Sequence, residues 1–308
     1  MTESHLEFEC FGGLVEVRAG GPGAAAALRR ARARLLEAHR RLSRFDPASE
    51  LSRLNRDERT EVPASPLLRL LAEAVAEAGE RSGGLVDGTL LREIECAGYV
   101  DSLPQDGPPE LLRSRLPGAP AGVSDRADWA RIGVDQQAGT VIRPPGVRID
   151  GGGLAKGMLA DLVGAELAGF ESFAVDCCGD LRLGGRAGAE RRILVDAPSG
   201  GEPIGELRLR GGGIATSGIS RRSWTGPKGQ PAHQIIDPRS GEPAFTGVVQ
   251  ATAVAPSALL AEVHAKSALL AGPAKATEWL PFGGVLVLDD GAVETVTASA
   301  ELPEPVLA

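Results

Sequence analysis

The chain has 308 residues, a net charge of −8 and 43% hydrophobic residues. It can therefore bury a sizeable core, and its acidic balance argues against a nucleic-acid partner, whose phosphates need clustered Lys and Arg. Aromatic residues make up only 4%, so we expect a core of Leu, Val, Ile and Ala. No apolar run approaches the roughly 20 residues of a membrane span, and the acidic start lacks the apolar segment of a signal peptide. We therefore expect a cytoplasmic protein without membrane insertion.

The predicted elements mix strands and helices without a regular alternation. From the N-terminus they are a strand over residues 7–17 that is interrupted at Gly12-Gly13, a helix over 24–42, a short helix capped by Ser49, a helix over 66–82, a strand end at 147–149 and a helix over 154–167. Short strands follow over 173–175, 192–196, 205–209, 213–216, 233–236 and 248–254, then a helix over 258–270 and strands over 284–288 and 293–296. The Pro- and Gly-rich segment 101–128 reads as a surface insertion. The order predicts an α+β fold with mostly antiparallel sheets and packed helices.

A strand end, three glycines and a helix start follow one another between Ile149 and Lys156. Free N–H groups and the dipole at a helix N-terminus bind anions, and Lys156 adds a full positive charge. Asp150 stands before the glycines, where a carboxylate can accept from a ribose hydroxyl or bind a metal. The spacing fits neither a Walker A loop nor a dinucleotide fingerprint. The stretch predicts an anion site, although a tight strand-to-helix connection with a surface lysine explains the same residues.

The four cysteines, Cys10, Cys96, Cys177 and Cys178, form neither a metal-ligand spacing nor an evident disulfide framework. The adjacent pair reads as two small apolar residues in or near a strand rather than as a redox couple.

Seven motifs in order resemble one family, the FAD:protein FMN transferases, also called ApbE-like flavin transferases. They cover residues 43–55, 84–89, 150–161, 175–181, 215–218, 233–243 and 255–272. The resemblance implies a single ApbE-like unit over residues 1–308, of T-fold-related architecture, with the FAD site between two lobes. It also implies the reaction. Such enzymes bind FAD and Mg²⁺, cleave the FAD pyrophosphate, transfer FMN to a Thr or Ser hydroxyl of an acceptor protein and release AMP.

The resemblance assigns roles to single residues of this sequence. It implies that the main-chain oxygen of Gly153 ligates the metal and that His233, in the motif His-Ile-Ile-Asp-Pro, lies at the active site. We expect His233 to act as the base because imidazole titrates near neutrality, although a lone histidine in a β-rich segment is more often structural. The positions expected to contact the flavin nucleotide are Phe11, Leu85, Val86, Asp87, Asp150, Lys156 and Thr216.

The sequence departs from the family at the helix that binds the metal. The family has Asp-x-x-x-Thr there, and this chain has Glu262 and Lys266. Glutamate still offers oxygen ligands, but a protonated lysine has no free lone pair. Either Glu262, the Gly153 carbonyl and the pyrophosphate hold a metal while Lys266 adds charge, or the ammonium replaces the metal. A plain i, i+4 salt bridge between Glu262 and Lys266 is the third interpretation.

Three functions stay open at the level of the sequence. The leading one is an FMN transferase that modifies a cytosolic acceptor protein. The alternatives are an FAD pyrophosphatase giving FMN and AMP, and a flavin-binding protein that has lost catalysis through the change at Lys266. A small-molecule acceptor is a weaker variant of the first.

Overall fold

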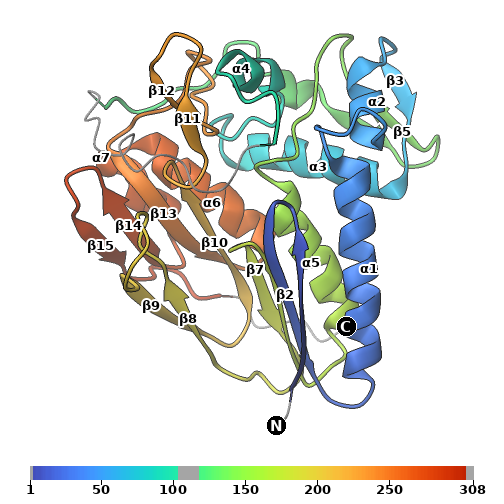
Figure 1. Cartoon of the computed structure of the whole chain (residues 1–308), viewed down its shortest axis with the longest axis vertical. Coiled ribbons are helices and arrows are strands. Elements are labelled where there is room, and N and C mark those ends of the chain that lie inside the picture. The colour runs from blue at the N-terminus through green and yellow to red at the C-terminus, as the bar shows by residue number, and fades with distance from the viewer. Residues whose placement is uncertain (1–2, 103–117, 303–308) are drawn as a thin grey trace.

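An eight-stranded antiparallel sheet forms the centre of the protein (Figure 1). The computed structural model describes residues 3–102 and 118–302. The strand order is β1 (Glu3–Cys10), β2 (Gly13–Gly20), β6 (Ser172–Cys177), β7 (Leu181–Gly184), β10 (Gly212–Gly218), β13 (Val248–Ala255), β14 (Gly284–Leu288) and β15 (Val293–Val296). Every neighbouring pair in this sheet is antiparallel. The predicted α+β class with mostly antiparallel sheets is therefore confirmed.

Three smaller antiparallel sheets surround the central one. They pair β3 (Glu61–Pro63) and β4 (Gly133–Asp135) with β5 (Thr140–Ile142), β8 (Arg191–Val195) with β9 (Gly205–Leu209), and β11 (Ser223–Thr225) with β12 (Pro231–His233). The strand end predicted at 147–149 is wrong, because no strand is formed there. Instead, the amide side chain of Asn55 accepts from the N–H of Ile149 and donates to its carbonyl, both at 2.8 Å. One side chain thus replaces the partners that a neighbouring strand would offer.

Three long helices cover one face of the central sheet. Helix α1 (Ala24–Leu42) contacts β1 and β2, α5 (Ala155–Leu167) contacts β6 and β7, and α6 (Ala258–Ala271) contacts β10 and β13 (Figure 1). Helix α3 (Pro66–Arg81) contacts all three of them. The shorter helices are α2 (Glu50–Arg56), α4 (Leu91–Cys96) and α7 (Pro273–Ala276), with 3₁₀ turns η2 (Asp128–Arg131) and η3 (Thr277–Trp279). In the described ranges, no helix combines the length and apolar character needed to cross a membrane.

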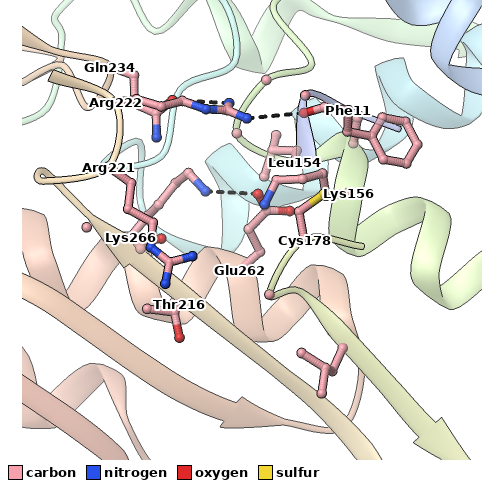
Figure 2. Close-up of a pocket in the computed structure, with 18 of the residues that line it drawn as sticks. Phe11, Leu154, Lys156, Cys178, Thr216, Arg221, Arg222, Gln234, Glu262 and Lys266 are labelled. Atoms are coloured by element: carbon pink, nitrogen blue, oxygen red, sulfur yellow. Dashed lines mark hydrogen bonds and ion pairs between the residues drawn. The ribbon is translucent and has the colours of Figure 1, made fainter. Parts of the chain in front are cut away.

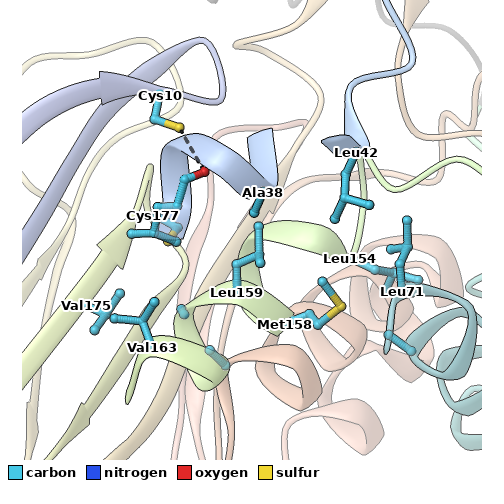
Figure 3. Close-up of a cluster of buried hydrophobic side chains, with 14 of the residues drawn as sticks. Cys10, Ala38, Leu42, Leu71, Leu154, Met158, Leu159, Val163, Val175 and Cys177 are labelled. Carbon is cyan, nitrogen blue, oxygen red and sulfur yellow. Dashed lines mark hydrogen bonds between the residues drawn. The ribbon is translucent and has the colours of Figure 1, made fainter. Parts of the chain in front are cut away.

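The core between sheet and helices is built from aliphatic side chains, as the low aromatic content predicts (Figure 3). Alternate residues of each strand, such as Val15, Val17 and Val175, point toward α1 and α5 and are fully buried. Cys177 belongs to the same cluster, and the thiol of Cys10 donates to the carbonyl of Leu35 at 3.8 Å. The cysteines are free thiols, and the two buried ones fill space in the core.

Helices α5 and α6 approach each other closely because of two residues of α5. The carboxylate of Asp161 accepts from the first two N–H groups of α6, at 2.8 and 2.9 Å, and so caps that helix. Gly157 faces the start of α6, where a Cβ would lie 2.7 Å from the carbonyl oxygen of Ala258. The contact fixes how the first turn of α5 faces the side chains of α6.

Most of the predicted insertion 101–128 lies outside the described residues, which resume at Gly118. The part that follows is fastened to the rest of the fold rather than standing free. Ala119 donates to the carbonyl of Phe245 and Ala121 to that of Leu270, both at 2.9 Å, and the N–H of Gly122 donates to Asp237 at 2.8 Å. The division into two lobes stays a prediction.

Candidate active site

A cavity of about 860 Å³ lies where two hairpin turns meet the N-terminus of α5. One turn, Phe11–Gly12, joins β1 to β2, and the other, Cys178–Gly179, joins β6 to β7. All four residues have positive φ, from 56° to 93°, which is the conformation of type I′ hairpin turns. The cavity continues over side chains on the sheet face opposite the helices, and residues 190–196, around β8, form a further wall.

The glycine-rich stretch and the loop after α3 are held together at this cavity. The N–H of Asp150 donates to the carbonyl of Gly88 at 2.8 Å, which joins the stretch to the loop carrying Leu85, Val86 and Asp87. All three of those loop residues line the cavity, as does Asp150. Asn55 fixes the residue before Asp150 through its two bonds to Ile149, so one side chain of α2 sets the position of this wall.

The carboxylate of Asp87 is fixed from within its own loop. It accepts from the N–H and the hydroxyl of Thr89, at 2.8 and 2.6 Å. Burial raises the pKa of Asp87 above its ordinary value, and the bonds from Thr89 offset this only in part.

Arg44 is a cavity residue that the sequence did not single out. Its guanidinium lies 4.2 Å from the ring centre of Phe45 and 4.4 Å from that of Tyr99, so it packs over both rings. It donates to the carbonyl of Tyr99 at 2.9 Å, and its Nε lies 3.6 Å from the carboxylate of Asp150. Arg44 lies inside a motif of the resemblance, but no local pattern pairs it with Tyr99 across the chain.

Two lysines and two carboxylates form a buried cluster at the start of α5, which we call the lysine–carboxylate cluster (Lys156, Asp180, Glu262 and Lys266). Lys156 forms a hydrogen-bonded ion pair with Asp180. Nζ of Lys266 donates to Oε1 of Glu262 at 3.1 Å, and the N–H of Gly157 donates to Oε2 at 3.1 Å (Figure 2). Lys156, Glu262 and Lys266 line the cavity. The cluster carries equal numbers of positive and negative charges when all four groups are ionised.

The charges within the cluster shift one another's pKa. Burial lowers the pKa of Lys156, but the charges of Asp180 and Glu262 outweigh it and raise the pKa overall. Burial raises the pKa of Glu262, but the ammonium groups of Lys266 and Lys156 bring it below its ordinary value. For Asp180, burial and the charge of Glu262 together raise the pKa. Lys156 is therefore charged at neutral pH.

The residues present do not fit a divalent cation at Glu262. Each oxygen of that carboxylate already accepts a hydrogen bond, and one of the donors is a cation. A Cβ at Gly153 would lie 2.8 Å from Cε of Lys266, so the end of the lysine passes directly over this glycine. Within the described residues, no three His, Cys, Asp or Glu side chains gather as a metal site.

The opposite wall of the cavity carries hydroxyls and arginines. Thr216 of β10 is paired with Thr252 on the neighbouring strand β13, and their hydroxyls share a hydrogen bond of 2.9 Å. Arg222 donates to the carbonyl of Phe11 at 3.2 Å and so holds the turn between β1 and β2 (Figure 2). The sequence missed Arg222, because its partner lies 211 residues away.

His233 occupies a different position from the other predicted site residues. It is 1% exposed, it packs edge-on against Phe245 with ring centres 4.7 Å apart, and it is not among the residues that line the cavity. Its Nδ1 accepts from the N–H of Ile235 at 3.3 Å. Burial lowers the pKa of His233 to about 3, so the ring is neutral at physiological pH. The neighbouring Gln234 does line the cavity.

The cavity thus brings together every predicted site residue except His233. These residues come from the turn after β1, the loop after α3, the start of α5, strand β10 and helix α6: Phe11, Leu85, Val86, Asp87, Asp150, Gly153, Lys156, Thr216, Glu262 and Lys266. Their roles stay predictions. The fold and the cavity define an α+β protein with paired lysines in a cavity of the size that holds large cofactors.

The chain belongs to the ApbE family, whose sequence profile matches residues 11–286. It is 28% identical over 282 residues to the FAD:protein FMN transferase of Vibrio cholerae serotype O1, a match that covers 86% of this chain and 80% of the relative. It is 25% identical over 262 residues to the protein of the same name from Haemophilus influenzae, covering 79% and 72%. A third relative of that name, from Rhodobacter capsulatus, is 28% identical over 238 residues, which are 74% of this chain but 44% of the relative.

Solved structures agree on the fold. The ApbE protein of Thermotoga maritima superposes with a TM-score of 0.78 at 24% identity, over 96% of this chain and 97% of that one. The apo flavinyl transferase ApbE of Pseudomonas stutzeri gives 0.75 at 21% identity, over 98% and 96%. The ApbE-like architecture expected from the resemblance is confirmed.

Proposed function

We propose that this protein is an FAD:protein FMN transferase. It binds FAD in the 860 Å³ cavity, cleaves the pyrophosphate and transfers FMN to a Thr or Ser hydroxyl of an acceptor protein. The observation that carries the proposal is the convergence of the glycine-rich stretch, the loop around Asp87 and the lysine–carboxylate cluster on one cavity. Curated relatives over most of the chain bear this name.

The reaction requires positive charge near the pyrophosphate and alignment of the acceptor hydroxyl with the phosphorus that it attacks. The acceptor oxygen attacks the flavin-side phosphorus, the anhydride P–O bond breaks, AMP leaves with the bridging oxygen, and the hydroxyl proton passes to a base. Lys156 and Lys266 lie on the cavity wall and bring positive charge to the pyrophosphate. The glycines place no side chain over the backbone N–H groups before α5, although the N–H of Gly152 already donates to Asp150 and that of Leu154 to Gly151. Asp150, held by its loop and by Arg44, is a candidate partner for a polar group of the dinucleotide.

We assign the role of the base to His233, whose ring is neutral and able to take a proton. In this arrangement the ring must turn toward the cavity, because it is buried against Phe245 and does not line the cavity. The His233→Ala variant should bind FAD normally and lose AMP release by about 10²-fold or more. Unchanged turnover would remove His233 from the mechanism.

One experiment tests the function. The purified protein is incubated with FAD and Mg²⁺, with and without host lysate, and AMP and covalently bound flavin fluorescence are followed. AMP together with a fluorescent polypeptide on a denaturing gel supports transfer. AMP and free FMN without a labelled polypeptide indicates an FAD pyrophosphatase, and bound FAD without AMP under any condition refutes the enzyme. The cytoplasmic setting and the cytosolic acceptor stay predictions.

A further inference from the structure

Lys266 lies on the cavity wall beside the buried carboxylate of Glu262. Its side chain leaves α6, passes over Gly153 and ends at the carboxylate of Glu262, 3.1 Å away (Figure 2). Gly153 makes room for it, because any side chain there would meet Cε of the lysine. The ammonium therefore lies between the glycine-rich stretch and α6, on the surface that faces the cavity.

Glu262 is arranged to hold an ammonium rather than to bind a dication from the cavity. It is 2% exposed, and its two oxygens receive one hydrogen bond each, from Lys266 and from the backbone of Gly157. A divalent ion on Oε1 would stand against the ammonium, with only this one carboxylate to compensate both charges. The remaining buried carboxylate of the cluster, Asp180, is already paired with Lys156. The cluster is balanced without any further cation.

The choice of lysine is itself informative in this chain. Only four lysines occur among its 33 basic residues, and two of them are in this cluster. An ammonium is a compact point charge with three donors, whereas guanidinium is broad and planar. After its bond to Glu262, the ammonium of Lys266 retains two N–H groups for phosphate oxygens.

We propose that the ammonium of Lys266, held by Glu262 over Gly153, takes the place of a divalent cation on the FAD pyrophosphate, so that this protein works without a metal. The inference rests on the proposed function for its catalytic meaning, but its structural claim, that Lys266 fills a cation site, stands on the contacts alone. Lys266 neutralises charge on the phosphate oxygens as the anhydride bond breaks, and it is a catalytic residue in this sense.

The test compares metal-free wild type with Lys266→Thr, which removes the ammonium, and with Lys275→Thr, a matched control on the exposed surface of α7. Mn²⁺ alone is titrated into each protein and free Mn²⁺ is measured by electron paramagnetic resonance. We expect Lys266→Thr to bind Mn²⁺ at least about tenfold more tightly than wild type or the control, since Glu262 then has no cation. Equal Mn²⁺ binding by all three proteins would overturn the proposal.

AMP release from FAD is then measured in EDTA and in Mn²⁺. Wild type should keep its rate in EDTA within about twofold, while Lys266→Thr should fall about 10²-fold in EDTA and regain part of the rate with Mn²⁺. Loss of AMP release by wild type in EDTA, with recovery when metal is added, would refute metal independence. This measurement does not depend on the folding of a variant. A wild type that releases no AMP under any condition would refute the proposed function instead, and Mn²⁺ binding would still decide what Lys266 replaces.

Discussion

Acidification should destabilise this protein through His233. In the native state the ring is buried and its pKa is about 3, whereas a histidine in the unfolded chain titrates near 6.5. As the pH falls below 6.5, the histidine of the unfolded state binds a proton, whereas the buried ring of the native state stays unprotonated. The stability contributed by the neutral ring is therefore fully present above pH 6.5 and is lost progressively as the pH falls toward 3.

The size of the effect follows from the unfolded state alone while the native ring stays neutral. Between pH 7.5 and 5.5, protonation of an unfolded histidine lowers the free energy of unfolding by about 1.4 kcal/mol. Other buried groups also shift stability with pH. Asp161 and Asp176 have raised pKa values and oppose the effect, and His39 has a lowered pKa and adds to it. A variant that lacks only the titration of residue 233 separates these contributions.

The matched variant is His233→Asn. Its amide oxygen can accept from the N–H of Ile235 in place of Nδ1, but it does not titrate. Urea unfolding followed by circular dichroism at pH 7.5 and 5.5 gives the free energy of unfolding for both proteins. Wild type should lose about 1.4 kcal/mol more than His233→Asn over this interval. Equal losses would refute the buried, neutral assignment, and would mean that the ring reaches solvent and is free to serve the cavity directly.

Three further substitutions test the supports of the site. Asn55→Ala removes both side-chain hydrogen bonds to the backbone of Ile149. The free energy of unfolding, measured in urea, should fall by about 2–3 kcal/mol, and FAD should bind more weakly. Gly153→Ala pushes Lys266 aside and should slow AMP release about 10- to 100-fold with an unchanged circular dichroism spectrum; an unaltered rate would contradict the close packing. Asp161→Ala removes two hydrogen bonds to the first turn of α6, which keeps its cap at Ser257, and should cost about 1–2 kcal/mol of stability by thermal unfolding.

The sequence predicted the elements whose causes are local. Helix α1 has the predicted bounds, Ala24–Leu42, because its leucine stripe and alanine content act over successive turns. Ser49 caps α2 as expected, accepting from the N–H of Ser52 at 2.9 Å. The sheet of β3, β4 and β5 was missed, since strands of three residues leave almost no periodicity to read.

The residues that the sequence brought to one cavity belong to local motifs, and their roles stay predictions. The sequence missed cavity residues whose contacts are with distant segments. The glycine-rich stretch could be singled out from its local pattern, and its role as an anion site stays a prediction. Arg44 donates to the carbonyl of Tyr99, which is 55 residues away in the sequence. Arg222 donates to the carbonyl of Phe11, which is 211 residues away. His233 was assigned from its motif, but its burial against Phe245 is a property of packing that one sequence does not show.

The apolar and the charged residues of the cavity wall have different physical consequences. Leu85 and Val86 are apolar residues on this wall, where Val86 is almost fully buried, and they set its shape. Their loop is held by the hydrogen bond from the N–H of Asp150 to the carbonyl of Gly88. The change at Lys266 instead places a full positive charge beside a buried carboxylate, and the neighbours at Gly153 and Glu262 accommodate it in both space and charge. A plain ion pair between Glu262 and Lys266 would show the same contacts, so AMP release in EDTA separates the two: only a working cation predicts a wild type that keeps its rate without metal and loses it in Lys266→Thr.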